Sequence, residues 1–225
     1  MVLIGLRRVN GHFKPAASIM EFASANPSVV RSIKQRVLLN AWLRALRKPR
    51  PLPVLADFQP DGISDELADM MGFDVEGRGE TARFFITQEG ARLAATYGSE
   101  HIEPAKRTNR YLDDAIGAER YALVVPGYRE CLARRRPTYS IARLEDPDGK
   151  EVAYERLLLP FGGDHVEQII GSYKTISIEG SFNVNNLMGV RPGVIPIRIV
   201  DAVIDLELAR QPQSIRASDD IIEAN

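Results

Sequence analysis

The stretch from 118 to 177 decides the fold: AERYALVVPGYRECLARRRP (118–137) is followed by TYSIARLE (138–145), EVAYERLLLPFG (151–162) and HVEQIIGSYKTIS (165–177). In the first segment, apolar residues recur at helical spacing, which predicts a long helix over 118–136 with one apolar face. That face consists of Tyr121, Val124, Val125, Tyr128, Cys131 and Leu132. The later segments are rich in Val, Ile, Leu and Tyr and are separated by turn residues, which predicts three antiparallel strands. A helix across such strands forms a cup, which favours a binding or sensing module.

The composition indicates a single soluble domain with extensions. The chain has 225 residues, of which 44% are hydrophobic and 26% charged, as in ordinary globular proteins. Its single cysteine, Cys131, excludes an internal disulfide framework and is compatible with a reducing compartment. No apolar run approaches the roughly 18 residues of a membrane span, and the start lacks a secretory cleavage region. We therefore expect a cytoplasmic protein without a membrane span.

The charge is distributed unevenly along the chain. Residues 1–56 carry ten Lys or Arg and one acid, whereas the remainder carries 19 basic and 29 acidic groups. The basic part could bind an anionic partner such as nucleic acid, or it could be a solvated face that complements the acidic body. The basic residues are spread out and lack interleaved aromatics, so we do not expect nucleic acid to be the partner.

Three regions follow from the pattern of helix and turn signals. Residues 1–25 read as an N-terminal arm, residues 26–178 as the domain, and residues 179–225 as a partly flexible extension. Within the domain, Asn26-Pro27 predicts the start of a leading helix over 28–47. Its apolar stripe consists of Val30, Ile33, Val37, Ala41 and Ala45, widened by Leu38 and Trp42. The prolines that follow end this helix.

The middle of the chain predicts shorter elements. A short helix is expected over 63–71, a weak strand over 73–75, and a better strand over 82–87 that continues to 97 beyond a bulge at Gly90. Residues 110–116 predict a helical turn. Residues 197–208 predict either a strand or a short helix, and residues 210–225 a loose acidic tail.

Several short motifs follow one another in a recognisable order. They are Trp42-Leu43-Arg44, Leu52-Pro53, Asp57-Phe58-Gln59-Pro60, Arg83-Phe84-Phe85, Arg110-Tyr111-Leu112-Asp113-Asp114 and Tyr154-Glu155-Arg156-Leu157-Leu158-Leu159-Pro160. In this order they resemble the small single-domain PAS proteins common in alphaproteobacteria, over roughly residues 36–177. A glycine is usual in that group where this chain has Asn109, which tolerates the same left-handed backbone.

The resemblance implies an α+β, PAS-like fold: a five-stranded antiparallel sheet with helices over one face, preceded by the helix 28–47. PAS domains act as sensors or docking modules in signal transduction, and some hold haem, flavin or a small acid between the sheet and the long helix. The resemblance therefore implies a homodimer through the helix 28–47, a signalling protein as partner and no catalytic activity. Whether the cup holds a small-molecule ligand stays open, because many PAS domains hold nothing known. The resemblance assigns no particular cofactor.

Six residues are candidates for the wall of the cup. They are Tyr121, Val125, Tyr128, Leu132, Arg156 and Leu158. Arg156 interrupts an apolar strand, and either orientation of its side chain is open. If it points inward, its charge needs a carboxylate or an anionic ligand as partner; if it points outward, it pairs with a neighbour such as Glu167. The run Arg134-Arg135-Arg136 could likewise clamp an anion, but it also suits a helix C-terminus.

Cofactor and metal sites find little support in the sequence. A haem site would need a histidine in the cup; the predicted long helix has none, and His101 in the preceding segment is the remaining candidate. A photoactive flavin site would need a cysteine in another setting than that of Cys131. Residues 146–149 lack the later ligands of a calcium loop and read as a hairpin turn.

Two other classes of function stay open as alternatives. The first is a small enzyme of the isomerase or hydratase type, which would need a buried acid with a shifted pKa, with Asp113, Asp114 or Glu155 as candidates. The second is nucleic-acid binding by the basic N-terminal region, which predicts an affinity that falls steeply with salt.

Overall fold

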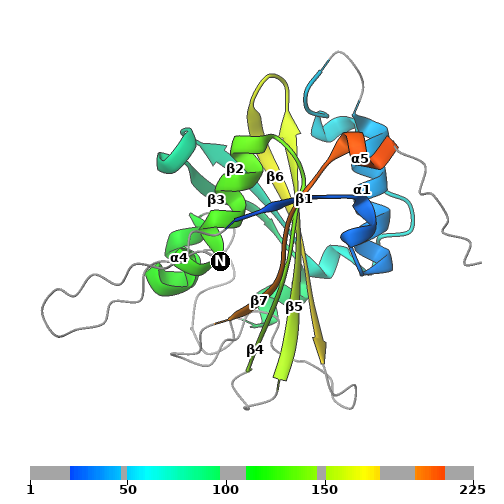
Figure 1. Ribbon diagram of the computed structural model, residues 1–225. Helices are drawn as coiled ribbons and strands as arrows, with labels where there is room; N and C mark the ends of the chain where they lie inside the picture. Colours follow the sequence, from blue (N-terminus) through cyan, green and yellow to red (C-terminus); the bar gives the residue numbers. More distant parts are fainter. Residues whose placement is uncertain (1–20, 47–49, 97–109, 146–150, 178–195, 211–225) are drawn as a thin grey trace, which may run out of the picture.

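The computed structural model describes residues 21–46, 50–96, 110–145, 151–177 and 196–210, and it shows an α+β fold built on one seven-stranded sheet (Figure 1). The strands are β1 (Ala23–Ala25), β2 (Met70–Glu76), β3 (Arg83–Glu89), β4 (Thr138–Glu145), β5 (Glu151–Gly162), β6 (Val166–Ser177) and β7 (Ile197–Ile204). The helices are α1 (Ile33–Ala45), α2 (Ala91–Thr96), α4 (Leu112–Arg134) and α5 (Leu206–Arg210), with short 3-10 turns between them. None of these helices is long and apolar enough to cross a membrane.

The sheet contains the five expected strands and two more. Its order is β1-β7-β4-β5-β6-β2-β3. The expected strands β4, β5, β6, β2 and β3 lie side by side, and every pair among them is antiparallel. The prediction of exactly these five was incomplete, because β7 adds antiparallel to β4 and β1 adds parallel to β7. The sheet is therefore mixed.

The two additional strands come from the ends of the described chain. Residues 197–208, for which strand and short helix were both open, form strand β7 and then enter α5. The three residues of β1 lie in the predicted arm. They pair with β7 in a register that places Ala23 opposite Ala202. Main-chain hydrogen bonds hold this corner: Asp205 N donates to Ala25 O over 2.9 Å, and Ile204 N donates to Pro137 O over 2.8 Å.

Helices cover both faces of the sheet, contrary to the expectation of one. Residues directly opposite in register point to the same face. Leu157 of β5 lies opposite Ser172 of β6, and that face carries α1, since Gln35 Nε2 donates to Ser172 O over 3.0 Å and to Ser172 Oγ over 3.3 Å. The adjacent residue Arg156 faces α4, as its hydrogen bond to the carbonyl of Val124 shows. Figure 1 shows α1 and α4 on opposite sides of the strands.

The leading helix differs from its predicted bounds and stripe. Asn26 Oδ1 accepts from Ser28 N over 3.0 Å and caps a 3-10 turn, Pro27–Val29, while α1 itself begins after the cap residue Ser32. The buried positions of α1 are Gln35, Leu38, Leu39, Ala41, Trp42 and Ala45. The predicted stripe is wrong at Ile33, which is 70% exposed, because the helix turns the side of Leu38 and Trp42 to the sheet.

The long helix is confirmed over 118–134, with a break before it. Gly117 has a φ of +76°, outside the helical range, so the expected turn over 110–116 and the long helix meet there at a kink. Pro126 lies inside the helix. At the C-terminal end, Arg135 adopts a left-handed conformation with a φ of +52° and ends the helix.

Two shorter predictions in the middle of the chain are wrong. The helix expected over 63–71 is only a 3-10 turn, Leu67–Asp69, because Met70 and Met71 already belong to strand β2. The strand expected beyond Gly90 is the helix α2. A Cβ on Gly90 would overlap the carbonyls of Leu67 and Ala68, so the chain passes close to that turn and leaves the sheet there. The tail at 211–225, His101 and the turn at 146–150 lie outside the described residues.

Candidate functional site

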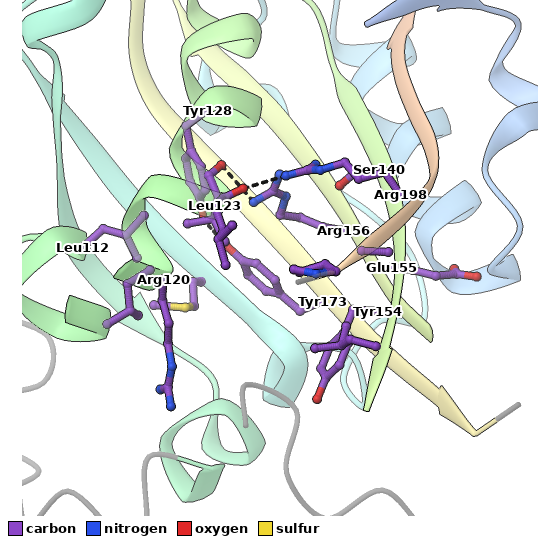
Figure 2. A pocket seen from close by; sticks show the side chains of 16 residues that line it. Leu112, Arg120, Leu123, Tyr128, Ser140, Tyr154, Glu155, Arg156, Tyr173 and Arg198 are labelled. Atoms are coloured by element: carbon purple, nitrogen blue, oxygen red, sulfur yellow. Dashed lines mark hydrogen bonds between the residues drawn. The ribbon is translucent and has the colours of Figure 1, made fainter. Parts of the chain in front are cut away.

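A cavity of about 140 Å³ lies between α4 and the sheet (Figure 2). Its apolar wall consists of Met71, Leu112, Ile116, Leu123, Val124, Ala142, Leu144 and Pro196. Its polar and aromatic wall consists of Arg120, Tyr128, Ser140, Tyr154, Arg156, Tyr173 and Arg198. Helix α4 supplies one side, and strands β2 and β4 to β7 supply the other. The expected cup between the long helix and the last strands therefore exists in the described structure.

Tyr128 lines the cavity from helix α4. Its hydroxyl is hydrogen-bonded to the hydroxyl of Tyr173, and its ring packs against Phe73 and Phe84, with centroids 5.3 Å and 4.9 Å away. The ring and hydroxyl are fully buried, so the charged phenolate form would be deprived of its hydration. This desolvation raises the pKa of Tyr128 to about 12. The positive charge of Arg156 acts in the opposite direction on this pKa but is the smaller effect.

Arg156 points into the cavity, which decides between its two orientations. Nη1 donates to the carbonyl of Val124 over 3.1 Å, and the guanidinium lies 5.3 Å from the centre of the Tyr128 ring. A Cβ on Gly127 would overlap Nη2, so the glycine leaves the space that the guanidinium occupies against α4. Among the described residues, no carboxylate forms an ion pair with Arg156, and Glu167 lies instead beside His165.

Arg198 reaches the same part of α4 from strand β7. Nη2 donates to the carbonyl of Leu123 over 2.6 Å, and Nη1 pairs with Asp201 over 3.0 Å. Side chains thus bond to two successive carbonyls of a helix next to Pro126. A proline inside a helix lacks the N–H for the preceding turn and bends the helix at that turn, which exposes carbonyls to other donors.

The charges around the cavity do not balance. Arg120, Arg156 and Arg198 line it, and Asp201 neutralises only the last of them. Glu155 borders the cavity as well, but its register opposite Lys174 turns its side chain to the α1 face, and Figure 2 shows it pointing away. Within the described part of the chain, Arg120 and Arg156 have no ion-pair partner.

The six predicted pocket residues do not all meet the cavity. Tyr128 and Arg156 line it. Val125 and Leu158 are buried in the core, and Tyr121 and Leu132 are half-buried against that core. These four residues border the cup of the fold without lining its empty part. Four further lining residues were not predicted from the sequence: Arg120, Ser140, Tyr173 and Arg198.

A period of two along the strands could have found Ser140 and Tyr173. Both lie directly opposite Arg156 in the register, one on β4 and the other on β6. Arg198 gave no such signal, because the sequence did not distinguish strand from helix over its segment.

The acids proposed for catalysis lie elsewhere. Asp113 and Asp114 pair with Arg83 at the surface, over 3.0 Å and 3.5 Å. Glu155 is buried, at 3% exposure, but lies on the α1 face. The arrangement that an isomerase or hydratase would require, one isolated carboxylate inside the cavity, is not formed by these three residues.

The remaining candidates for cofactors and anions are also away from the cavity. Cys131 is fully buried on α4, and burial raises the pKa of its thiol. His165 lies in the β5–β6 turn, and the described residues contain no cluster of three His, Cys, Asp or Glu that could hold a metal ion. Arg134 pairs with Glu130 over 2.8 Å, and Arg135 donates to Asp164 O. This run therefore serves the end of α4.

Comparison with protein-family models, with curated proteins and with solved structures finds no match in any of the three. Function must therefore be inferred from the cavity and from the elements that surround it.

Proposed function

We propose that the chain is a PAS-domain sensory or protein-interaction module that acts through ligand-dependent or partner-dependent contacts, without catalysis of its own. Two features support this. The strands β3, β2, β6, β5 and β4 are neighbours and antiparallel, as the resemblance requires, and a long helix encloses a cavity against them. We further propose that it acts in the cytoplasm, as a homodimer, on a signalling partner.

One observation carries the proposal: strand β5 separates the cavity from the leading helix α1. Tyr154 and Arg156 face the cavity, whereas Leu157 and Leu159 on the same strand face α1. Adjacent residues of one strand move together because they share a rigid backbone. A ligand that displaces Arg156 would therefore also displace the surface on which α1 rests.

Helix α1 and its leading turn are attached to that surface by specific bonds as well as by apolar packing. Trp42 Nε1 donates to Pro160 O over 2.7 Å, and Arg31 N donates to Tyr139 Oη over 3.1 Å. The contacts of Gln35 with β6 add a third attachment. Directional bonds tolerate small displacements poorly, so the helix has a defined position that a shift of β5 would change.

The test compares loaded and stripped protein. Native mass spectrometry of the chain purified from its own host reports what is bound, and hydrogen exchange then follows residues 33–45 before and after removal of the bound molecule by unfolding and refolding. We expect exchange in α1 to change by at least threefold while exchange in β3 stays constant. Equal exchange of α1 in the two states contradicts the proposed coupling.

The dimer is tested separately. The outer side of α1 presents Ile33, which is 70% exposed and suits a helix–helix contact between copies. Ile33→Glu should then shift sedimentation from dimer to monomer. Leu67→Glu, a matched control at 45% exposure in another element, should leave it unchanged. A wild-type protein that sediments as a monomer contradicts the dimer.

A further inference from the structure

The cavity has a charged end and an apolar body. The guanidinium of Arg156 lies against the middle of α4, whereas the side chain of Arg120, farther along the cavity on the same helix, points away from Arg156 (Figure 2). Leu112, Ile116 and Leu144 form the remaining wall. A ligand that fits both parts must be polar at one end and apolar over the rest of its surface.

The charged end favours an anion. Arg156 has five N–H donors and uses one of them on Val124 O, and its planar fork matches the two oxygens of a carboxylate. No described acid pairs with Arg156 or Arg120, whereas Arg198 already has Asp201. A cation partly removed from water is costly without a counter-charge, so an anionic group bound there would gain more than a neutral one.

The apolar body limits the size and type of the ligand. A volume of about 140 Å³ is close to the roughly 150 Å³ of an engineered apolar cavity that holds benzene. Multiply charged anions such as inorganic phosphate would place charge against leucine and isoleucine, which costs desolvation without compensation.

We propose that the cavity binds a small amphipathic carboxylate, an aryl or short alkyl acid whose carboxylate contacts Arg156 and whose body lies against Leu112, Ile116 and Leu144. This inference rests on the proposed function, because it names the ligand class of the same cavity.

Calorimetric titration of the stripped protein tests the ligand class. The probes are benzoate and hexanoate, their neutral isosteres benzamide and hexanamide, and inorganic phosphate. We expect each carboxylate to bind at least tenfold tighter than its amide, because a charge-assisted bond to arginine is worth a factor of about 10 to 100 in affinity. Phosphate should bind more weakly than both carboxylates.

Variants assign the effect to Arg156. Arg156→Gln should remove the preference for carboxylate over amide, and Arg156→Lys, which keeps the charge without the fork, should retain part of it. Arg134→Gln is the matched control, since Arg134 is exposed at the end of α4, pairs with Glu130 and does not line the cavity. If Arg156→Gln does not fold, as judged by circular dichroism, the reduced preference expected of Arg156→Lys carries the test.

Three results overturn the inference: amides that bind as tightly as acids, a preference that survives Arg156→Gln, or no binding of any probe. These failures are separable from failure of the proposed function. A different molecule found by native mass spectrometry, together with altered exchange in α1, would leave the sensory module intact and exclude only the carboxylate.

Discussion

Replacing Trp42 by alanine tests whether α1 is docked on the face of the sheet opposite the cavity. Trp42 is fully buried, and its indole N–H donates to the carbonyl of Pro160 over 2.7 Å. Truncating a buried tryptophan to alanine costs about 3–5 kcal/mol of unfolding free energy, and leaving a buried carbonyl unpaired adds about 1–3 kcal/mol. We expect Trp42→Ala to lower the unfolding free energy by about 4–8 kcal/mol.

A second variant separates packing from hydrogen bonding. Trp42→Phe keeps a buried ring but leaves Pro160 O without its donor, which should cost about 1–3 kcal/mol. Asn40→Ala is the control on the same helix: its side chain is exposed, so the change should stay within about 0.5 kcal/mol.

Urea unfolding followed by far-ultraviolet circular dichroism measures these changes. Fluorescence is unsuitable, because Trp42 is the only tryptophan in the chain. The midpoint should move while the dependence on urea concentration stays constant, since the folded state keeps its compactness. A cost below about 1.5 kcal/mol for Trp42→Ala would refute the docking of α1 and, with it, the coupling through β5.

Three further predictions concern buried polar groups. Cys131 should react with a thiol reagent at pH 8 at least about 100-fold more slowly in the native than in the urea-unfolded protein, because burial raises the pKa of its thiol. Comparable rates would show that solvent reaches the thiol in the folded protein. The pKa of Tyr128 is about 12 in the folded protein, against about 10 in the unfolded chain. This difference contributes roughly 2–3 kcal/mol to the free energy of unfolding, which is fully present below pH 10 and is lost as the pH rises toward 12. Tyr128→Phe should flatten this alkaline loss in urea unfolding, and an unchanged pH profile would contradict the assignment. Lys174→Met should cost about 3 kcal/mol, because Lys174 pairs with the buried Glu66 and Asp69 over 2.5 Å and 2.9 Å; a cost under about 1 kcal/mol in the same assay would show that the ion pairs do not stabilise the fold.

Local patterns predicted the last three of the five expected strands closely. Strand β4 spans the predicted segment TYSIARLE, and β5 spans EVAYERLLLPFG, because both have strong strand formers bounded by turn residues. The kink at Gly117 was less visible, since glycine is tolerated inside helical patterns as well as at their breaks. Non-local strand pairing was not predictable at all: β1 has three residues, and only its position beside β7 makes it a strand.

The error in the stripe of α1 has a related cause. Ile33 fits a helical apolar period, and Gln35 breaks it, yet the structure buries Gln35 and exposes Ile33. Gln35 is buried because Ser172 on β6 accepts from its amide, a partner 137 residues away in the chain. A periodicity rule assigns burial from side-chain chemistry alone and has no information about such a partner.

The direction of Arg156 shows why the site needed the structure. A strand covered by helices on both faces reads as a nearly continuous apolar run, so its sequence does not mark one face as inner. Leu157, Leu158 and Leu159 are all buried, although they alternate between the two faces. The hydrogen bond from Arg156 to the carbonyl of Val124 on α4 places its charge on the cavity side, together with its register partners Ser140 and Tyr173. The same alternation puts the buried side chain of Glu155 on the face that carries α1. The adjacent residues Glu155 and Arg156 therefore place an acidic group on the α1 face and a basic group on the cavity face. A carboxylate bound to Arg156 would neutralise its charge and so alter the electric field at Glu155, even without a movement of β5. If this electrostatic effect contributes to the coupling, Glu155→Gln should weaken the effect of the ligand on hydrogen exchange in α1.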